Sequence, residues 1–229
     1  MWKKLALKVA VPTLFASAGV VSSVAVTNLV LQQKRERPKE VIEEPYTQYI
    51  ISQYDQVFRS VGEKYGIDWL FLSAIARAES EFRFDAISKA GAVGLMQIMP
   101  LVARNMGYTR EALFDAQVNV EVAARLLIEN NNMLHLPEEF DNNQRLRFIL
   151  ACYNAGYSRI ADARRLALYH EDDHNDWNIV STYLELLSEP EFAEHEVVQS
   201  GGFRGSNETI AYVKKVMHIY RRYRSRIVL

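Results

Sequence analysis

One carboxylate lies on the apolar side of a predicted helix within residues 74–84, AIARAESEFRF. At about 100° per residue, three apolar side chains fall within roughly 60° of Glu79: Leu72, Ile75 and Ala76. Arg77 and Glu81 fall on the opposite face, where their i,i+4 spacing predicts an exposed ion pair. A buried ionised carboxylate is unfavourable unless it is paired or protonated. Glu79 is therefore a structural glutamate with a basic partner, a helix end that emerges at the surface, or a general acid.

Of these three interpretations, only the general acid gives Glu79 a role in a reaction. Desolvation raises the pKa of a glutamate above its reference value of about 4.3, so the group can carry a proton near neutral pH. Glycosidases usually pair such an acid with a second carboxylate. Asp85 and Asp162 are the candidates for that second group. We expect Asp85 to turn a loop and Asp162 to pair with an arginine on its own helix, which leaves Glu79 as a single acid.

A second pattern suggests different chemistry. Residues 170–174, HEDDH, match the H-E-x-x-H pattern of zinc metalloproteases. That site requires a helix that places His170 and His174 on one face, with a third ligand nearby. Acidic and polar residues follow directly, and the preceding helix is predicted to end near Tyr169. The segment is interpreted as a solvated acidic loop, and zinc-dependent proteolysis through His170 and His174 is a minor alternative.

The elements that must position these residues are predicted to be helices, because apolar residues recur at three- and four-residue steps. Asp68, Asn119 and the pair Asp141 and Gln144 are predicted to cap helix N-termini, and Gly66 to end the first helix. Alternating strand patterns are scarce, so the soluble part is expected to be mainly α. The predicted helices cover 46–65, 68–79, 100–107, 119–133, 146–153, 158–168, 177–187 and 207–224.

The N-terminus has a different composition. No charged residue occurs between Lys8 and Lys34, a stretch longer than the about 20 residues that cross a bilayer core. With the basic residues before it, this stretch predicts a signal peptide or an uncleaved membrane anchor over residues 1–33. Residues 34–45 are polar and charged and form a predicted tether. The remaining residues, 46–229, are sufficient for one domain with a sizeable core.

The overall composition limits the possible functions. The chain has 229 residues, with 27 basic and 28 acidic side chains, so it is not expected to be a general nucleic-acid binder. Cys152 is the only cysteine, which excludes a disulfide framework within the chain. No cysteine directly follows the apolar stretch to carry a lipid.

Several short motifs occur in a defined order along the chain: AES at 78–80, GLMQIMP at 94–100, YNAG at 153–156, ET at 208–209 and YV at 212–213. In that order the chain resembles the soluble-lytic-transglycosylase (SLT) domain of the lysozyme superfamily over roughly residues 46–224. Within this family, the segment from Tyr153 to Tyr212 is similar to the membrane-bound lytic murein transglycosylase F group, which carries an additional regulatory domain before its catalytic domain.

The resemblance implies a lysozyme-like α-helical catalytic domain in which Glu79 is the single catalytic acid. It implies that Ser80 positions this acid or the acetamido group of the substrate. Met96 and Gln97 then line the sugar groove. Helical spacing also allows Met96 to be a core residue, and Gln97 to be a surface or capping amide.

The same resemblance places Tyr153 and Asn154 on the opposite wall of the groove, and directs the hydroxyl of Tyr212 toward the acid. Tyr153 and Tyr212 are also compatible with amphipathic core positions whose hydroxyls are hydrogen-bonded. Asn154 is equally well placed to end its helix. Cys152 stands where the family commonly has alanine and is interpreted as a small core residue.

The implied reaction cleaves peptidoglycan glycan strands between N-acetylmuramic acid and N-acetylglucosamine and leaves a 1,6-anhydro end. It needs no metal and no cofactor. A hydrolytic, lysozyme-type muramidase on the same fold is the alternative, and a member that binds glycan without cutting it is a further one. We expect a monomer on the periplasmic side of the bacterial cell envelope, held in the membrane by the apolar segment or released if that segment is cleaved.

Overall fold

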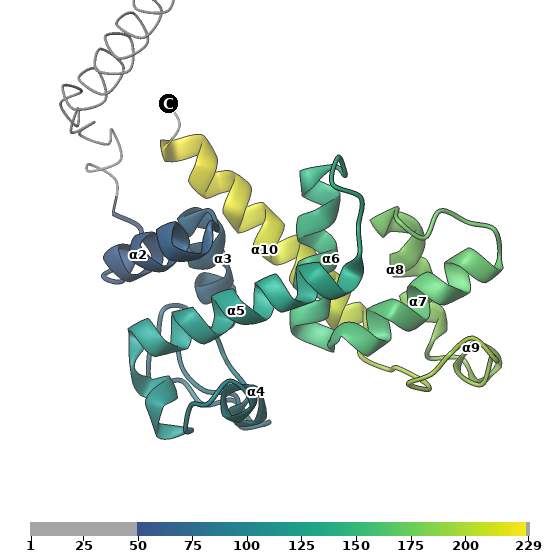
Figure 1. The fold of residues 1–229 in the computed structure, drawn as a ribbon, viewed down its shortest axis with the longest axis horizontal. Helices are drawn as coiled ribbons and strands as arrows, with labels where there is room; N and C mark the ends of the chain where they lie inside the picture. The colour runs from purple at the N-terminus through teal and green to yellow at the C-terminus, as the bar shows by residue number, and fades with distance from the viewer. Residues whose placement is uncertain (1–49, 228–229) are drawn as a thin grey trace, which may run out of the picture. The chain divides into compact units, whose positions relative to one another are not determined.

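A computed structural model describes residues 50–227, which belong to a compact unit spanning Gln48–Leu229. The described part is mainly helical, as expected (Figure 1). Its β-structure consists of isolated bridges that Val93 forms with Ile87 and Ile98. The helices are α2 (Asp55–Tyr65), α3 (Trp69–Glu79), α4 (Pro100–Asn105), α5 (Ala116–Leu134), α6 (Asn142–Ala155), α7 (Tyr157–Tyr169), α8 (Trp177–Leu186), α9 (Pro190–Ala193) and α10 (Ser206–Ile227), with a 3₁₀ turn, η2 (Glu111–Phe114).

Helix α3 is the most deeply buried helix near the candidate acid. Every residue from Leu70 to Ala76 is buried, and the helix packs on α2 and on the long helix α10 (Figure 1). The Asp68 side chain accepts a hydrogen bond from the Leu70 N–H at 2.9 Å, which confirms the predicted N-cap. The helix ends at Glu79, with Ser80 as its C-cap. The last turn of a buried helix therefore presents the glutamate.

The cap of α5 differs from the predicted one. The helix begins at Ala116, and the Asp115 side chain accepts from the Val118 N–H at 2.9 Å. Asn119 lies inside the first turns and is fully buried, so the prediction that it caps this helix is wrong. Asp141 caps α6 as expected, accepting from the Gln144 N–H at 2.9 Å. The Gln144 side chain does not complete a capping box, because its oxygen accepts from the Trp177 N–H at 3.0 Å.

The first helix of the domain is shorter than the periodicity predicts. It begins at Asp55, whose carboxylate accepts hydrogen bonds from the backbone N–H groups of Ile51 and Ser52 and so forms a turn before the helix. Gly66 ends the helix in a left-handed conformation, as predicted. The predicted anchor and tether, and residues 46–49 of the predicted helix, lie outside the described residues. Within the described range no helix has both the length and the apolar character to cross a bilayer.

The described domain contains its own hydrophobic core. Its buried apolar residues run from Phe58 to Tyr220 and come from every helix of α2–α8 and from α10. Helices α5 and α6 pack together, α6 also contacts α10, and α7 packs on α8 (Figure 1). A non-helical segment, residues 81–99, connects α3 to α4 and contains the GLMQ motif. The core thus holds α3, α6 and α10 around the point where α3 ends.

Candidate active site

The candidate site is the environment of Glu79 at the C-terminal end of α3. Its side chain is half-buried, and Tyr212 and Lys215 of α10 act on its carboxyl. The charge of Glu79 in turn acts on the Tyr153 phenol of α6. These helices meet here because α10 packs on both α3 and α6. The fold therefore brings Tyr153 and Tyr212 near Glu79, and the roles that the family resemblance implies for them stay predictions.

Burial determines the protonation of Glu79. Desolvation raises the pKa of its carboxyl to about 7, while Tyr212 and the positive charge of Lys215 act in the opposite direction. The group is therefore protonated in a substantial fraction of molecules near neutral pH. A carboxyl with this property can donate a proton and then accept one, which a fully ionised surface glutamate cannot do efficiently.

The two tyrosines differ in their hydrogen bonding. The Tyr153 hydroxyl donates to the Met96 carbonyl oxygen at 2.7 Å. The Tyr212 hydroxyl is buried and forms no hydrogen bond of good geometry within the described part of the chain, although it lies close enough to Glu79 to lower that pKa. Burial and the charge of Glu79 hold the pKa values of both phenols well above their usual range. Both hydroxyls therefore stay protonated at neutral pH.

Ser80 and Met96 have structural contacts. The Ser80 hydroxyl is buried and donates to the Leu95 carbonyl oxygen at 2.8 Å. This hydrogen bond joins the end of α3 to residues 93–98, here called the GLMQ loop. The Met96 side chain is fully buried. The prediction that this side chain lines the sugar groove is therefore not met in the structure, because the fold of the loop turns it into the core and leaves its carbonyl to accept from Tyr153.

Gln97 and Asn154 lie nearer the surface. Gln97 is half-buried with a left-handed backbone (φ = 50°), and its amide nitrogen donates to the carbonyl oxygens of Gly94 at 3.0 Å and Ala86 at 3.2 Å. Asn154 is exposed near the end of α6, and its oxygen accepts from the Thr209 hydroxyl at 2.8 Å. Both side chains thus brace the loops around Glu79, and substrate contact by either remains a prediction.

Asp162 proves to be structural. Its side chain is fully buried on α7, where it pairs with Arg165 and accepts hydrogen bonds from the N–H groups of Gln199 at 2.8 Å and Ser200 at 2.9 Å. The predicted pairing with an arginine of its own helix is confirmed. Asp162 thereby holds the segment that leads into α10, the helix that carries Tyr212. Asp85, the other candidate, is exposed on the loop after α3.

Two other sequence interpretations have clear outcomes. The predicted pair of Arg77 with Glu81 is wrong, because α3 ends at Glu79 and Glu81 has a left-handed backbone (φ = 55°). The Arg77 guanidinium instead lies 6.0 Å from the Phe82 ring centroid.

The HEDDH motif lies beyond the end of α7, with a left-handed backbone at Glu171 (φ = 61°). The helix that the metalloprotease motif requires is not formed, as the loop interpretation expected.

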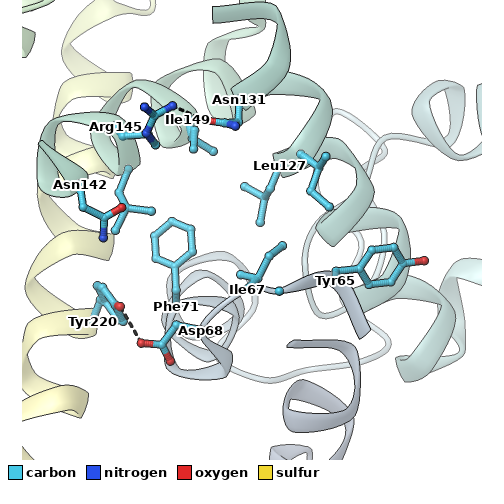
Figure 2. A pocket seen from close by; sticks show the side chains of 13 residues that line it. Tyr65, Ile67, Asp68, Phe71, Leu127, Asn131, Asn142, Arg145, Ile149 and Tyr220 are labelled. Carbon is cyan, nitrogen blue, oxygen red and sulfur yellow. Dashed lines mark hydrogen bonds between the residues drawn. The ribbon is translucent and has the colours of Figure 1, made fainter. Parts of the chain in front are cut away.

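A separate cavity of about 400 Å³ lies at the other end of α3 (Figure 2). Phe71 points into it, and the Tyr220 hydroxyl donates to Asp68 at 2.6 Å on its rim. At 1.5 Å rise per residue, the eleven residues of α3 separate this rim from Glu79 by about 15 Å. The cavity is therefore not part of the candidate active site.

The comparisons with known proteins agree with this fold and motif order. The family model described as "Transglycosylase SLT domain" matches residues 56–175, and the chain belongs to this family. A membrane-bound lytic murein transglycosylase F from Marinobacter nauticus is 31% identical over 172 residues, covering 74% of this chain and 32% of the relative. One from Stutzerimonas stutzeri is 31% identical over 175 residues, covering 76% of this chain and 35% of the relative.

Solved structures have the same fold. The 70 kDa soluble lytic transglycosylase SLT70 from Escherichia coli is similar with a TM-score of 0.55 and 25% identity, covering 76% of this chain and 24% of that one. An inactive mutant of the lytic transglycosylase Slt from Pseudomonas aeruginosa has a TM-score of 0.54 at 22% identity, with the same coverage. The chain spans about a third of the length of the curated relatives and about a quarter of these structures.

Lys215 is a site residue that sequence reasoning missed. It is exposed on α10, and its ammonium donates to the Ala78 carbonyl oxygen at 2.8 Å, directly before Glu79. A cation at the C-terminal end of α3 is favourable for the helix dipole and stabilises the charged form of Glu79. A lysine among other cations on an amphipathic helix carries no local signal of this role; only the packing of α10 on α3 reveals it.

Replacing Lys215 by methionine is expected to raise the pKa of Glu79 above about 7, because a positive charge beside the carboxylate is removed. If protonated Glu79 is the active form, the alkaline limb of the pH–rate profile moves upward. Because Lys215 is exposed, the shift should be small, about 0.3–0.5 pH units. Lys214→Met, an exposed neighbour on α10, is the matched control. An equal shift in both variants, or a downward shift, would contradict the assignment.

Proposed function

We propose that this chain is a peptidoglycan lytic transglycosylase that cleaves the β-1,4 bond between N-acetylmuramic acid and N-acetylglucosamine. The single observation that carries the proposal is the half-buried Glu79, whose pKa of about 7 suits alternate donation and acceptance of a proton. Membership of the SLT domain family and the names of its relatives support the substrate class. Tyr153 and Tyr212 on two other helices complete the surroundings of the acid.

In the first step, protonated Glu79 donates its proton to the glycosidic oxygen, and the bond from this oxygen to C1 of N-acetylmuramic acid breaks. The N-acetylglucosamine residue leaves with a hydroxyl group. Positive charge develops at C1, where the acetamido group of the same sugar assists. The Tyr212 hydroxyl donates to the Glu79 carboxylate as its charge forms, since the two groups lie close enough to shift each other's pKa.

In the second step, the Glu79 carboxylate accepts the proton of the sugar's own 6-hydroxyl. The oxygen of that hydroxyl bonds to C1 and closes the 1,6-anhydro ring, and Glu79 is protonated again for the next cycle. No water is consumed. Intramolecular attack removes much of the entropic barrier of a bimolecular step. The substrate thus replaces the second carboxylate that ordinary glycosidases require.

Ser80, Gln97 and Asn154 support this chemistry by holding the groove. Ser80 ties the acid-bearing helix end to the GLMQ loop, and Gln97 braces that loop against Ala86 and Gly94. The side-chain oxygen of Asn154 accepts a hydrogen bond from the Thr209 hydroxyl of α10. We further propose that Gln97, Asn154 and Tyr153 contact the glycan, and that Met96 contributes through its backbone alone because its side chain is buried.

We also propose that the N-terminal residues attach the chain to a membrane or direct its export. Residues 1–33 act as an anchor or signal peptide and residues 34–45 as a tether, so that the domain from residue 46 works on the periplasmic side of the cell envelope. The relatives are membrane-bound lytic murein transglycosylases F by name, which supports an envelope location. Fractionation of cells into membrane and soluble periplasmic parts, with sequencing of the mature N-terminus, decides between anchor and signal peptide.

Mass spectrometry of peptidoglycan digested by the full chain is the test of the reaction. Muropeptides ending in 1,6-anhydro-N-acetylmuramic acid are expected, because the sugar's own hydroxyl closes onto C1. Each such product is lighter by one water than its hydrolysed counterpart. Reducing ends as the main product would replace transglycosylation by lysozyme-type hydrolysis. The absence of cleavage, with glycan binding retained, would indicate a binding module.

A further inference from the structure

Asn119 is a fully buried polar side chain with an extended set of hydrogen bonds. Its oxygen accepts from the Met96 N–H at 2.8 Å. Its amide nitrogen donates to the carbonyl oxygens of Val93 and Leu113, each at 2.9 Å. Both hydrogens of the amide nitrogen are therefore used. One side chain on α5 thus fixes the GLMQ loop, residues 93–98, at two points and joins it to η2 at a third.

Gly94 makes this close approach possible. A Cβ atom at this position would lie 2.3 Å from the Asn119 amide nitrogen and 2.6 Å from the Leu113 carbonyl oxygen. The backbone at Gly94 is also left-handed, with φ = 82°. Any residue with a side chain would therefore push the loop away from α5. Gly94 and Asn119 form a matched pair that sets the position of the loop.

The loop connects Asn119 to the candidate site through two of its backbone carbonyl groups. The Met96 N–H donates to the Asn119 side-chain oxygen, and the Met96 carbonyl oxygen accepts from the Tyr153 hydroxyl at 2.7 Å. The neighbouring Leu95 carbonyl oxygen receives the Ser80 hydroxyl, directly beside Glu79. Tyr212 and Lys215 of α10 act on the Glu79 carboxyl, and the charge of Glu79 in turn raises the pKa of the Tyr153 phenol on α6. Met96 and Tyr153 therefore connect Asn119 to the surroundings of Glu79.

We propose that Asn119 is a positioning residue for the reaction: by fixing the GLMQ loop, it keeps the Tyr153 hydroxyl on the Met96 carbonyl and away from the Glu79 carboxylate. The proposal rests on the proposed function only in naming Glu79 the acid. When the loop is released, the Tyr153 hydroxyl loses its acceptor at Met96 and can donate instead to the Glu79 carboxylate, whose charge already acts on this phenol. A hydrogen bond to the charged form favours it, so Glu79 becomes a stronger acid.

The test is a titration of Glu79 in the full chain by NMR, with glutamate labelled with ¹³C at the side-chain carboxyl and the Glu79 signal assigned by its loss in Glu79→Gln. Four proteins are compared: wild type, Asn119→Ala, Tyr153→Phe and the double variant. In Asn119→Ala the midpoint is expected to fall from about 7 by about one pH unit. In the Tyr153→Phe background, Asn119→Ala is expected to produce less than about a third of that shift, because the phenol that transmits it is absent.

Asn130→Ala is the matched control. Asn130 lies on the same helix α5 and is also buried, at 2% exposure, so its loss tests general destabilisation. Its replacement should leave the Glu79 midpoint unchanged. If Asn119→Ala does not fold, Asn119→Asp is used, which keeps the acceptor for Met96 and loses both donors. An equal shift in Asn119→Ala and Asn130→Ala, or a full shift in the double variant, would overturn the proposal.

This titration requires no substrate, so its outcome is separable from that of the proposed function. Product mixtures without anhydro ends would remove the transglycosylase assignment and leave the coupling of Asn119 to Tyr153 in place. Conversely, anhydro products from a protein whose Glu79 titration is insensitive to Asn119 would retain the reaction and exclude this residue from it.

Discussion

Glu79→Gln is expected to lower kcat for peptidoglycan cleavage by at least about 10²–10⁴-fold, the usual contribution of a positioned acid or base. The expected loss lies at the top of this range or beyond it, because the same carboxyl serves both steps. Glutamine keeps the size of the side chain and can neither donate nor accept the proton at a useful rate. Release of soluble muropeptides, quantified against wild type at equal concentrations of folded protein, gives the result.

The same substitution is expected to stabilise the fold above neutral pH. The pKa of Glu79 is raised to about 7 from a reference of 4.5, so the folded state binds the proton more tightly than the unfolded state. Stability therefore falls as pH rises from about 4.5 to 7, and by pH 8 the charged carboxyl costs about 2–3 kcal/mol. Glu79→Gln removes this penalty. Chemical denaturation at pH 8 should show a higher free energy of unfolding than wild type, with little difference at pH 4.

Glu81→Gln is the matched control for both measurements. Glu81 is exposed two residues further along the chain, so its loss should leave activity and stability near wild type. Retention of substantial activity by Glu79→Gln would mean that the acid is misassigned. Equal stability of the Glu79→Gln variant and wild type at pH 8 would mean that the carboxyl is not desolvated in solution.

Asp162→Ala is expected to lower the free energy of unfolding at neutral pH by about 3 kcal/mol, which is the largest destabilisation expected for any of the substitutions proposed for this chain. The Asp162 carboxylate is fully buried, and its removal leaves the N–H groups of Gln199 and Ser200 and the guanidinium of Arg165 without their acceptor. Among the hydrogen bonds of the described residues, only those of Arg159 and Arg165 then hold the segment before α10 to α7. Urea denaturation followed by circular dichroism measures the change.

The pH dependence of this contribution has a defined sign. Burial alone would raise the pKa of Asp162, but hydrogen bonds from Ser200 and Gln199 and the pair with Arg165 hold it below its usual range. A carboxyl with a lowered folded-state pKa contributes stability above its unfolded pKa, and this contribution is lost as pH falls below about 4. The difference between wild type and Asp162→Ala should therefore shrink in acid.

Asp172→Ala provides the comparison for Asp162. Asp172 is exposed and accepts one hydrogen bond from the Tyr183 hydroxyl at 2.6 Å, so its loss should cost less than about 1 kcal/mol. If the two variants are equally destabilised, the network of Asp162 is no more important than a surface contact.

Local rules predicted much of the helical framework. The caps at Asp68 and Asp141 and the stop at Gly66 depend on contacts within a few residues, so the sequence contains all the information needed. The same local rules failed where the chain stops being regular. The pairing of Arg77 with Glu81 follows only if the helical periodicity continues past Glu79, but α3 ends there and the chain continues as the non-helical segment 81–99.

Asn119 shows a different limit. Its type and position favour a helix cap, and a neighbouring residue, Asp115, performs that function. The contacts of Asn119 go to Val93 and Met96, more than twenty residues earlier in the chain, and to Leu113. A sequence pattern cannot distinguish a capping asparagine from one that fixes a distant loop, because the difference lies entirely in which backbone is brought next to it.

The sequence by itself determined that Glu79 lies on the inward face of a helix, and its motifs identified the family and the residues to consider. Only the tertiary structure decided what that position does to the carboxyl. The pKa of about 7 arises from burial beneath segments separated along the chain, with Tyr212 and Lys215 opposing it. Desolvation depends on all atoms around a group, whichever part of the chain they come from, so the acidity of Glu79 exists only once α3, α6 and α10 have packed together.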